Sequence, residues 1–191
     1  MAHDNLGNLL VSGGLPPYTE ITQLGAGWST KTATAFAAVV TMPLTVANLE
    51  VVNNSAQKSM VIDTIFSWQL LGTAVAWAHT VWAQVGAKVY SANTALVIGS
   101  ANGLPTYTSA VGSEAATAIT QTVVATEWRV FPGSSAQAGT AAATPFGANV
   151  GQVDGRLIVP PGKALHVAVS ASVTTASAFQ CGASWFLVDL G

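Results

Sequence analysis

The stretch RLIVPPGKALHVAVSASV, residues 156–173, decides the fold class of this chain. From Leu165 to Val173 every second side chain is apolar, which is the pattern of a β-strand with one buried face. Pro160-Pro161-Gly162 separates this run from the apolar residues 157–159, and the tripeptide is typical of a chain reversal. The stretch therefore predicts two strands joined by a tight turn.

The same alternation marks three further segments, residues 59–71, 77–90 and 179–187. The side chains expected to be buried in these segments are Ile62, Thr64, Phe66, Trp68 and Leu70, then Val81, Ala83, Val85, Ala87 and Val89, then Phe179, Cys181, Ala183, Trp185 and Leu187. Gly72-Thr73 suits a turn, so the first two segments are predicted to form an antiparallel hairpin.

Shorter strands are expected at residues 34–41, 45–52, 95–99 and 119–130, and loops at 105–117 and 132–151. Ser113 is a candidate N-cap for a short helix, although the Thr- and Val-rich sequence after it favours a strand. About eight strands with Gly- and Pro-marked turns predict an all-β fold, an antiparallel β-sandwich of jelly-roll-like topology. An immunoglobulin-type sandwich is the alternative, disfavoured because the chain has a single cysteine.

The N-terminal residues 1–27 contain Gly13-Gly14 and Pro16-Pro17 and show no sustained period. We expect an extended N-terminal arm over residues 1–27, followed by a single β-sandwich domain over residues 28–191. An arm that lies on a neighbouring subunit and a frayed terminus are both compatible with this sequence.

The chain is poor in charge. Six Lys and Arg and eight Asp and Glu stand among 191 residues, the net charge is -2, and half of the residues are hydrophobic. The surface must then consist largely of Thr, Ser, Asn, Gln, Gly and Ala, which lose little hydration free energy when another protein covers them. This composition favours a subunit packed among copies of itself, that is, a homo-oligomer.

Several partners and compartments are excluded by the same sequence. The scattered cations form no basic stripe, so no nucleic acid partner is expected. No continuous apolar stretch is long enough to span a membrane, and the N-terminus lacks the basic and apolar regions of a signal peptide. We therefore expect synthesis in a reducing cytoplasm, with Cys181 as a buried small hydrophobe.

No motif for catalysis, cofactor binding or metal binding is found. The sequence lacks Gly-x-Ser-x-Gly, a glycine-rich phosphate loop and a close cluster of metal ligands. Ser55-Ala56-Gln57-Lys58 matches Ser-x-x-Lys without its companion motifs and is interpreted as a turn. His79 and His166 are interpreted as structural histidines. The chain is therefore not expected to be an enzyme or to need a cofactor.

Aromatic residues are the remaining candidates for a site. Leu15, Tyr18 and Trp28, at or beside the arm, are predicted contact anchors, because aromatic residues dominate binding hot spots. Trp82 and Tyr107 are predicted to be exposed and able to stack on a partner or a sugar ring. By contrast, Trp68 and Trp185 lie on the apolar sides of their segments and are expected in the core.

Four segments carry a resemblance to a known class of proteins: NLEVVNNS at residues 48–55, VIDTIFSW at 61–68, GRLIVPPG at 155–162 and GASWFLV at 182–188. Together they resemble small virion structural proteins of tailed bacteriophages, in particular the β-sandwich decoration, or cement, proteins of capsids. The resemblance spans most of the expected sandwich, and its motifs are strand and turn signatures.

The resemblance implies a virion structural protein on the capsid surface, which forms trimers and bridges the major capsid protein or other virion subunits. A tail or fibre component is compatible with the same motifs. The alternative function is a carbohydrate-binding tail or fibre module, or a secreted lectin-like domain, with Trp82 and Tyr107 among the stacking residues.

Overall fold

The computed structural model describes residues 19–39, 42–43, 45–71, 77–89, 94–103, 110–114, 121–122, 127–137, 148–171 and 178–190. The elements in chain order are α1 (Thr19–Gln23), β1 (Gly27–Lys31), β2 (Val46–Ala47), β3 (Leu49–Asn53), β4 (Lys58–Leu71), β5 (Trp77–Ala87), β6 (Thr94–Leu96), β7 (Gly99–Ser100), β8 (Ala110–Glu114), β9 (Gln121–Thr122), β10 (Arg129–Gln137), β11 (Ala148–Gln152), β12 (Ile158–Val159), β13 (Lys163–Ala171) and β14 (Ala178–Asp189).

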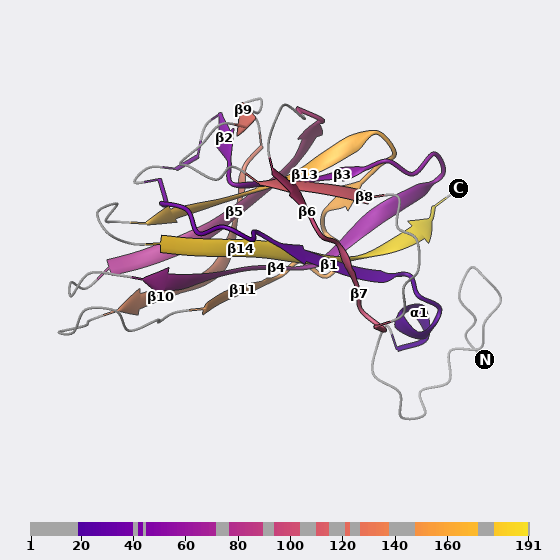
Figure 1. The fold of residues 1–191 in the computed structure, drawn as a ribbon, viewed down its shortest axis with the longest axis horizontal. Coiled ribbons are helices and arrows are strands. Elements are labelled where there is room, and N and C mark those ends of the chain that lie inside the picture. The colour runs from indigo at the N-terminus through magenta and orange to yellow at the C-terminus, as the bar shows by residue number, and fades with distance from the viewer. Residues whose placement is uncertain are drawn as a thin grey trace.

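Two antiparallel sheets form the two layers of the molecule (Figure 1). The first sheet has the order β11-β4-β14-β1-β7, and β12 also pairs with β4. The second sheet has the order β10-β5-β13-β3-β8-β6, and β2 pairs with β9 in a separate two-stranded sheet. The prediction of an all-β antiparallel sandwich is confirmed, whereas its jelly-roll topology stays a prediction.

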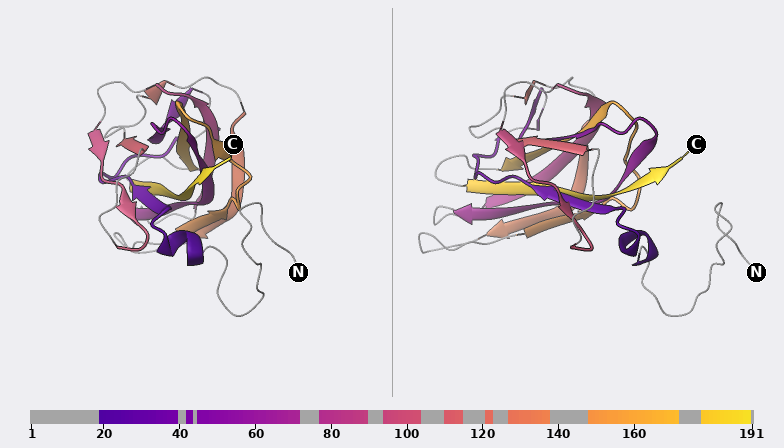
Figure 2. Two further views of the ribbon diagram at one scale, coloured as in Figure 1. Left: turned by 90° about the vertical axis from the view of Figure 1, so that its right-hand side faces the viewer. Right: turned by 45° about the vertical axis from the view of Figure 1, so that its right-hand side comes forward.

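The two long edges of the sandwich are closed in different ways. On one side β10 and β11, which belong to different sheets, lie against each other (Figure 1). On the other side the chain passes from β6 in the second sheet to β7 in the first through Val97 and Ile98. The hydroxyl of Thr30 in β1 donates to the carbonyl of Val97 at 2.9 Å and holds this crossing in place. Figure 2 shows the layers enclosing the interior when the molecule is viewed from one end.

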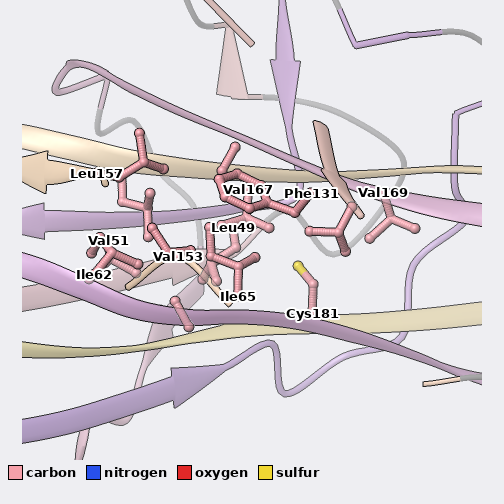
Figure 3. Packing of buried hydrophobic residues seen from close by; sticks show 14 of the residues in the cluster. Leu49, Val51, Ile62, Ile65, Phe131, Val153, Leu157, Val167, Val169 and Cys181 are labelled. Atoms are coloured by element: carbon pink, nitrogen blue, oxygen red, sulfur yellow. The ribbon is translucent and has the colours of Figure 1, made fainter. Parts of the chain in front are cut away.

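The core lies between the layers and takes side chains from both (Figure 3). In the first sheet, β14 lies between β4 and β1, so that Trp185 is opposite Ile62 on one side and Trp28 on the other. All three side chains are buried. In the second sheet, alternate residues of β13 point inward, and Leu165, Val167 and Val169 are fully buried. The predicted burial of these alternating faces is confirmed, as is the burial of Cys181.

The predicted hairpin between residues 59–71 and 77–90 is wrong. Both segments are strands, β4 and β5, but β4 pairs with β14 and β11 in the first sheet, whereas β5 pairs with β13 and β10 in the second. Both strands are long and have a buried face, and each finds neighbours on both sides within its own sheet. The connection through residues 72–76 lies outside the described residues.

The predicted turn at Pro160-Pro161-Gly162 is present. The amide of Lys163 donates to the carbonyl of Pro160 at 3.1 Å, and Gly162 has a φ of 74°, a left-handed conformation that glycine adopts without steric penalty. The strands on either side belong to different sheets, however: β12 pairs with β4 and β13 with β5 and β3. The turn therefore carries the chain from one layer to the other.

Several shorter elements differ from expectation. Residues 34–39 form isolated bridges from Phe36 to Phe179 and from Val39 to Ser170 rather than a strand, because the segment passes from one sheet to the other. β8 and the outer parts of β10 and β11 lie in predicted loops, where pairing with β3, β5 and β4 overrides weak local preferences. Within β8, Ser113 and Glu114 pair with β3, so Ser113 is not the N-cap of a helix.

The prediction of an extended arm over residues 1–27 is wrong for the residues that form a helix and the start of a strand. Thr19–Gln23 form helix α1, and β1 begins at Gly27. The amide of Ala26 donates to the carbonyl of Ile21 at 3.1 Å, and that of Leu187 donates to Ala26 at 2.9 Å, so the helix is tied to the end of β14. Figure 2 shows α1 at the end of the sandwich where β14 also ends. Residues 1–18 lie outside the described residues.

Candidate interaction surface

A bulge in β4 decides which of its side chains face outward. Ile62 is opposite Trp185 in β14, but the next paired residue, Thr64, is opposite Ser184, so Asp63 is the extra residue. A one-residue shift exchanges the two faces of a strand. Beyond Asp63 the inward positions of β4 are Ile65, Ser67 and Gln69, all buried, instead of Phe66, Trp68 and Leu70.

The bulge is held by backbone hydrogen bonds from the turn after β11. The carbonyl of Asp63 accepts from the amides of Val153 at 2.7 Å and Asp154 at 3.1 Å, and the carbonyl of Ile62 accepts from Gly155 at 2.9 Å. On the outer side, Oδ2 of Asp63 accepts from the hydroxyl of Thr64 at 2.8 Å. The change of faces is therefore fixed by contacts between segments far apart in the sequence.

The outer face of the first sheet is consequently apolar and aromatic. We call it the aromatic face, and its residues are Lys31, Val61, Phe66, Trp68, Val150, Ile158 and Phe186. Val150 is 51% exposed and Ile158 42% exposed, whereas the aromatic rings are half-buried. The face has two apolar groups. One contains Phe66, Trp68 and Val150, with Lys31 beside them, and the other contains Val61, Ile158 and Phe186. A polar row formed by Ser29, Thr64, Gln152 and Ser184 runs between the two groups.

Phe66 and Trp68 form the centre of one apolar group. Their rings are stacked, with centroids 5.7 Å apart and planes inclined by 18°. Phe66 lies over Gly182 of β14, and Nζ of Lys31 lies 5.7 Å from the centroid of Trp68. A cation over an indole face is attracted by its quadrupole. A partner that covers this group would remove two aromatic side chains from water while meeting a single cation.

Around Glu50 and His166, the outer face of the second sheet is more deeply buried than the aromatic face. Glu50 of β3 and His166 of β13 both point outward, and both are fully buried. Oε2 of Glu50 accepts from Nε2 of His166 at 2.9 Å and from the amide of Val89, which follows β5, also at 2.9 Å. The expectation that His166 is structural fits this arrangement, because its ring nitrogen is bound to a buried carboxylate.

His79 is the other histidine in a strand. Its ring lies on the inner side of β5, 5.3 Å from the ring of Phe179, and burial lowers the pKa of His79 from 6.5 to about 4. Its backbone carbonyl accepts from Nδ2 of Asn149 at 2.8 Å. The residue is therefore a neutral, buried part of the core at physiological pH.

Of the predicted contact residues, one is buried, one is half-buried and three lie outside the described residues. Trp28 is 3% exposed and packs in the core, so its prediction as an exposed anchor is wrong: β1 is an inner strand of its sheet, and the alternation of β1 points Trp28 into the core beside Trp185. Trp82 lies on the outer face of β5, half-buried, and its Nε1 donates to Oγ of Ser170 at 2.7 Å. Leu15, Tyr18 and Tyr107 lie outside the described residues.

The prediction that Trp68 lies in the core is wrong, because the bulge places it on the aromatic face, whereas the predicted burial of Trp185 is confirmed. Phe66, Lys31 and Val150 were not predicted to belong to a surface at all. The only local signal was Asp63-Thr64 within an otherwise apolar strand, and a polar pair of this kind does not distinguish a bulge from a polar face.

Among the described residues, no group of three or more potential metal ligands comes together. Ser55 of the Ser-x-x-Lys match uses its hydroxyl to accept from the amide of Lys58 at 2.8 Å, as a turn residue does. A cleft of about 690 Å³ is lined by Ala56, Gln57, Ser59, Pro160, Pro161, Asp189 and Leu190. Its polar lining residues are Gln57, Ser59 and Asp189.

Comparison with family models, with curated proteins and with solved structures finds no match to this chain. None of the helices in the described residues has the length and apolar character needed to cross a membrane.

Proposed function

We propose that this protein is a non-enzymatic structural subunit of a virus particle, a capsid decoration or cement protein that binds the surface of a phage head and bridges shell subunits. It acts as a homo-oligomer, a trimer as the resemblance implies, with the major capsid protein or another virion subunit as partner. Nucleic acid and membrane are not partners. The protein is made in the host cytoplasm and acts on the capsid surface.

The observation that carries the proposal is the aromatic face. Phe66, Trp68 and Val150 lie outward on neighbouring strands, and Lys31 is the one cation among the residues of this face. Burying apolar area contributes roughly 25 cal/mol per Å², and few ionic groups would have to be dehydrated in this process. Repetition of such a contact at every symmetry-related position stabilises a shell without high affinity at any single contact.

The test uses particles from which the protein has been stripped and measures rebinding by co-sedimentation. Trp68→Ser is expected to weaken rebinding by about tenfold or more, since a central aromatic residue behaves as a hot spot. Val97→Ser is the matched control, because Val97 is 89% exposed but lies on the crossing between β6 and β7, outside the aromatic face. Equal rebinding of both variants and the wild type would refute the role of this face.

Binding to carbohydrate is the second candidate, and the stacked pair of Phe66 and Trp68 favours it, because flat, half-exposed rings can stack on sugars. Thr64 and Ser184 in the neighbouring polar row supply hydroxyl groups. A glycan array separates the two functions: a cement protein binds no sugar on it, whereas a tail or fibre module binds a defined set that Trp68→Ser loses.

A further inference from the structure

The chain has two arginines, Arg129 and Arg156, and the fold brings them together although 27 residues separate them. Arg129 begins β10 at the edge of the second sheet, and Arg156 follows the turn after β11 at the edge of the first. Nη1 of Arg129 lies 3.4 Å from the carbonyl oxygen of Arg156. Figure 1 shows the two strands side by side at this seam of the sandwich.

Both arginines line a small pocket. It has a volume of about 140 Å³, and its other lining residues are Val130, Phe131 and Leu157. Val130 is 53% exposed, whereas Phe131 and Leu157 are buried and form an apolar floor. The pocket thus combines two cationic groups with apolar walls, in a protein where cations are scarce.

The guanidinium of Arg156 is oriented by the backbone. Its Nε donates to the carbonyl of Val153 at 2.9 Å and its Nη2 to the carbonyl of Gln152 at 2.6 Å. These two bonds leave the N–H groups of Nη1, and one of Nη2, available to another acceptor. For Arg129 the described bond is the long one to Arg156, so most of its five N–H donors remain available as well.

Among the described residues, the side chains of both arginines bond to backbone carbonyls, and neither pairs with a carboxylate. Yet an acidic residue stands two positions before each arginine: Glu127 and Asp154, both exposed. Both have positive φ, 66° and 48°. For Asp154 this conformation belongs to the turn closed by the amide of Arg156 and the carbonyl of Val153, because Gly155 also has a positive φ, 72°, and Asp-Gly is a preferred pair for such turns.

We propose that Arg129 and Arg156 form a binding site for a carboxylate of the shell partner, the side chain of an aspartate or glutamate. This inference rests on the proposed function, since it names the chemistry of one contact with that partner. A guanidinium fork matches a carboxylate in a bidentate manner, and Val130 and Leu157 are placed to contact the methylene stem of an acidic side chain. A phosphate backbone would need a longer basic track than two arginines.

The first experiment measures rebinding to stripped particles over a range of salt concentrations. A double variant with Arg129→Gln and Arg156→Gln is compared with a double variant with Lys58→Gln and Lys163→Gln. The lysine variant is the control, because it removes the same charge from exposed positions elsewhere. The double arginine variant is expected to lose about tenfold or more in affinity and to show a weaker salt dependence than the lysine control. Arg129→Gln is also tested alone, because Arg156→Gln breaks backbone contacts of its turn. Equal affinity of the arginine and lysine variants overturns the inference.

The second experiment uses the isolated protein and does not depend on particles. Because there are two arginines, their side-chain Nε–Hε groups give two NMR signals, and propionate and inorganic phosphate are titrated separately. Propionate is expected to shift both signals, and the shift is expected to disappear for the remaining arginine when the other is replaced. No shift with propionate, or a shift with phosphate alone, overturns the carboxylate site.

The two experiments distinguish the inference from the function on which it rests. If the wild type binds no particle, the proposed function fails, and a shift of both signals by propionate still supports a carboxylate site for a different partner. If the wild type binds particles and the arginine variants bind equally well, the carboxylate site fails and the proposed function stands.

Discussion

Gly182 of β14 lies directly under the ring of Phe66. A Cβ built on Gly182 would lie 2.4 Å from Cε2 and 2.5 Å from Cζ of Phe66, and 2.5 Å from the backbone oxygen of Thr30. The close approach exists because the bulge at Asp63 turns Phe66 to the outer side of β4, opposite Gly182. The geometry of the aromatic face therefore depends on the absence of a side chain at position 182.

Gly182→Ala is expected to lower the free energy of unfolding by about 1–3 kcal/mol, because the added methyl group meets a backbone atom that cannot rotate away. Denaturant unfolding measures the change. Gly99→Ala in the same sheet is the control, since the nearest atom to its Cβ would be the oxygen of Ser29 at 3.9 Å. A Gly182→Ala protein as stable as this control would contradict the close contact.

Glu50→Ala is expected to destabilise the protein by about 3–5 kcal/mol, because it leaves His166 and the amide of Val89 without their buried acceptor. Replacing both Glu50 and His166 by leucine is expected to be less harmful than Glu50→Ala alone, since no uncompensated polar side chain stays buried. Urea unfolding of the two variants tests this order. Hydrogen exchange at Val89, faster in Glu50→Ala, reports the lost contact directly.

The lowered pKa of His79 predicts a loss of stability in acid. Above pH 6.5 the residue is neutral in both the folded and the unfolded state. As the pH falls from 6.5 toward 4 the unfolded state takes up a proton that the folded state does not, so stability decreases, by up to about 3 kcal/mol. In His79→Gln this part of the pH dependence is expected to vanish. A stability difference between wild type and variant that stays constant from pH 7 to pH 4 would contradict the prediction.

Asn53 ties the turn that follows β3 to β12. Its Nδ2 donates to the carbonyls of Lys58 at 2.8 Å and Val159 at 2.9 Å, and its Oδ1 accepts from the amide of Ser55 at 3.0 Å. Asn53→Ala is expected to reduce the free energy of unfolding by about 2 kcal/mol, because buried carbonyls lose their donor. Ser55→Ala, which removes hydrogen bonds in an exposed part of the same turn, is expected to have a smaller effect. Thermal unfolding of the two proteins decides between these expectations.

The sequence by itself determined the all-β class, the buried faces of β13 and β14, and the turn at Pro160-Pro161-Gly162. These features are local: a period of two and a proline-glycine turn act through the backbone of neighbouring residues. The burial of Cys181 followed from the same alternation.

Only the tertiary structure decided which sheet each strand joins, the outward direction of Phe66 and Trp68, and the meeting of Arg129 with Arg156. Each of these depends on hydrogen bonds between distant segments, as when the amides of Val153 and Asp154 hold the bulge at Asp63. A period of two says which side chains share a face. It does not say which strand lies alongside, or where one extra residue exchanges the faces.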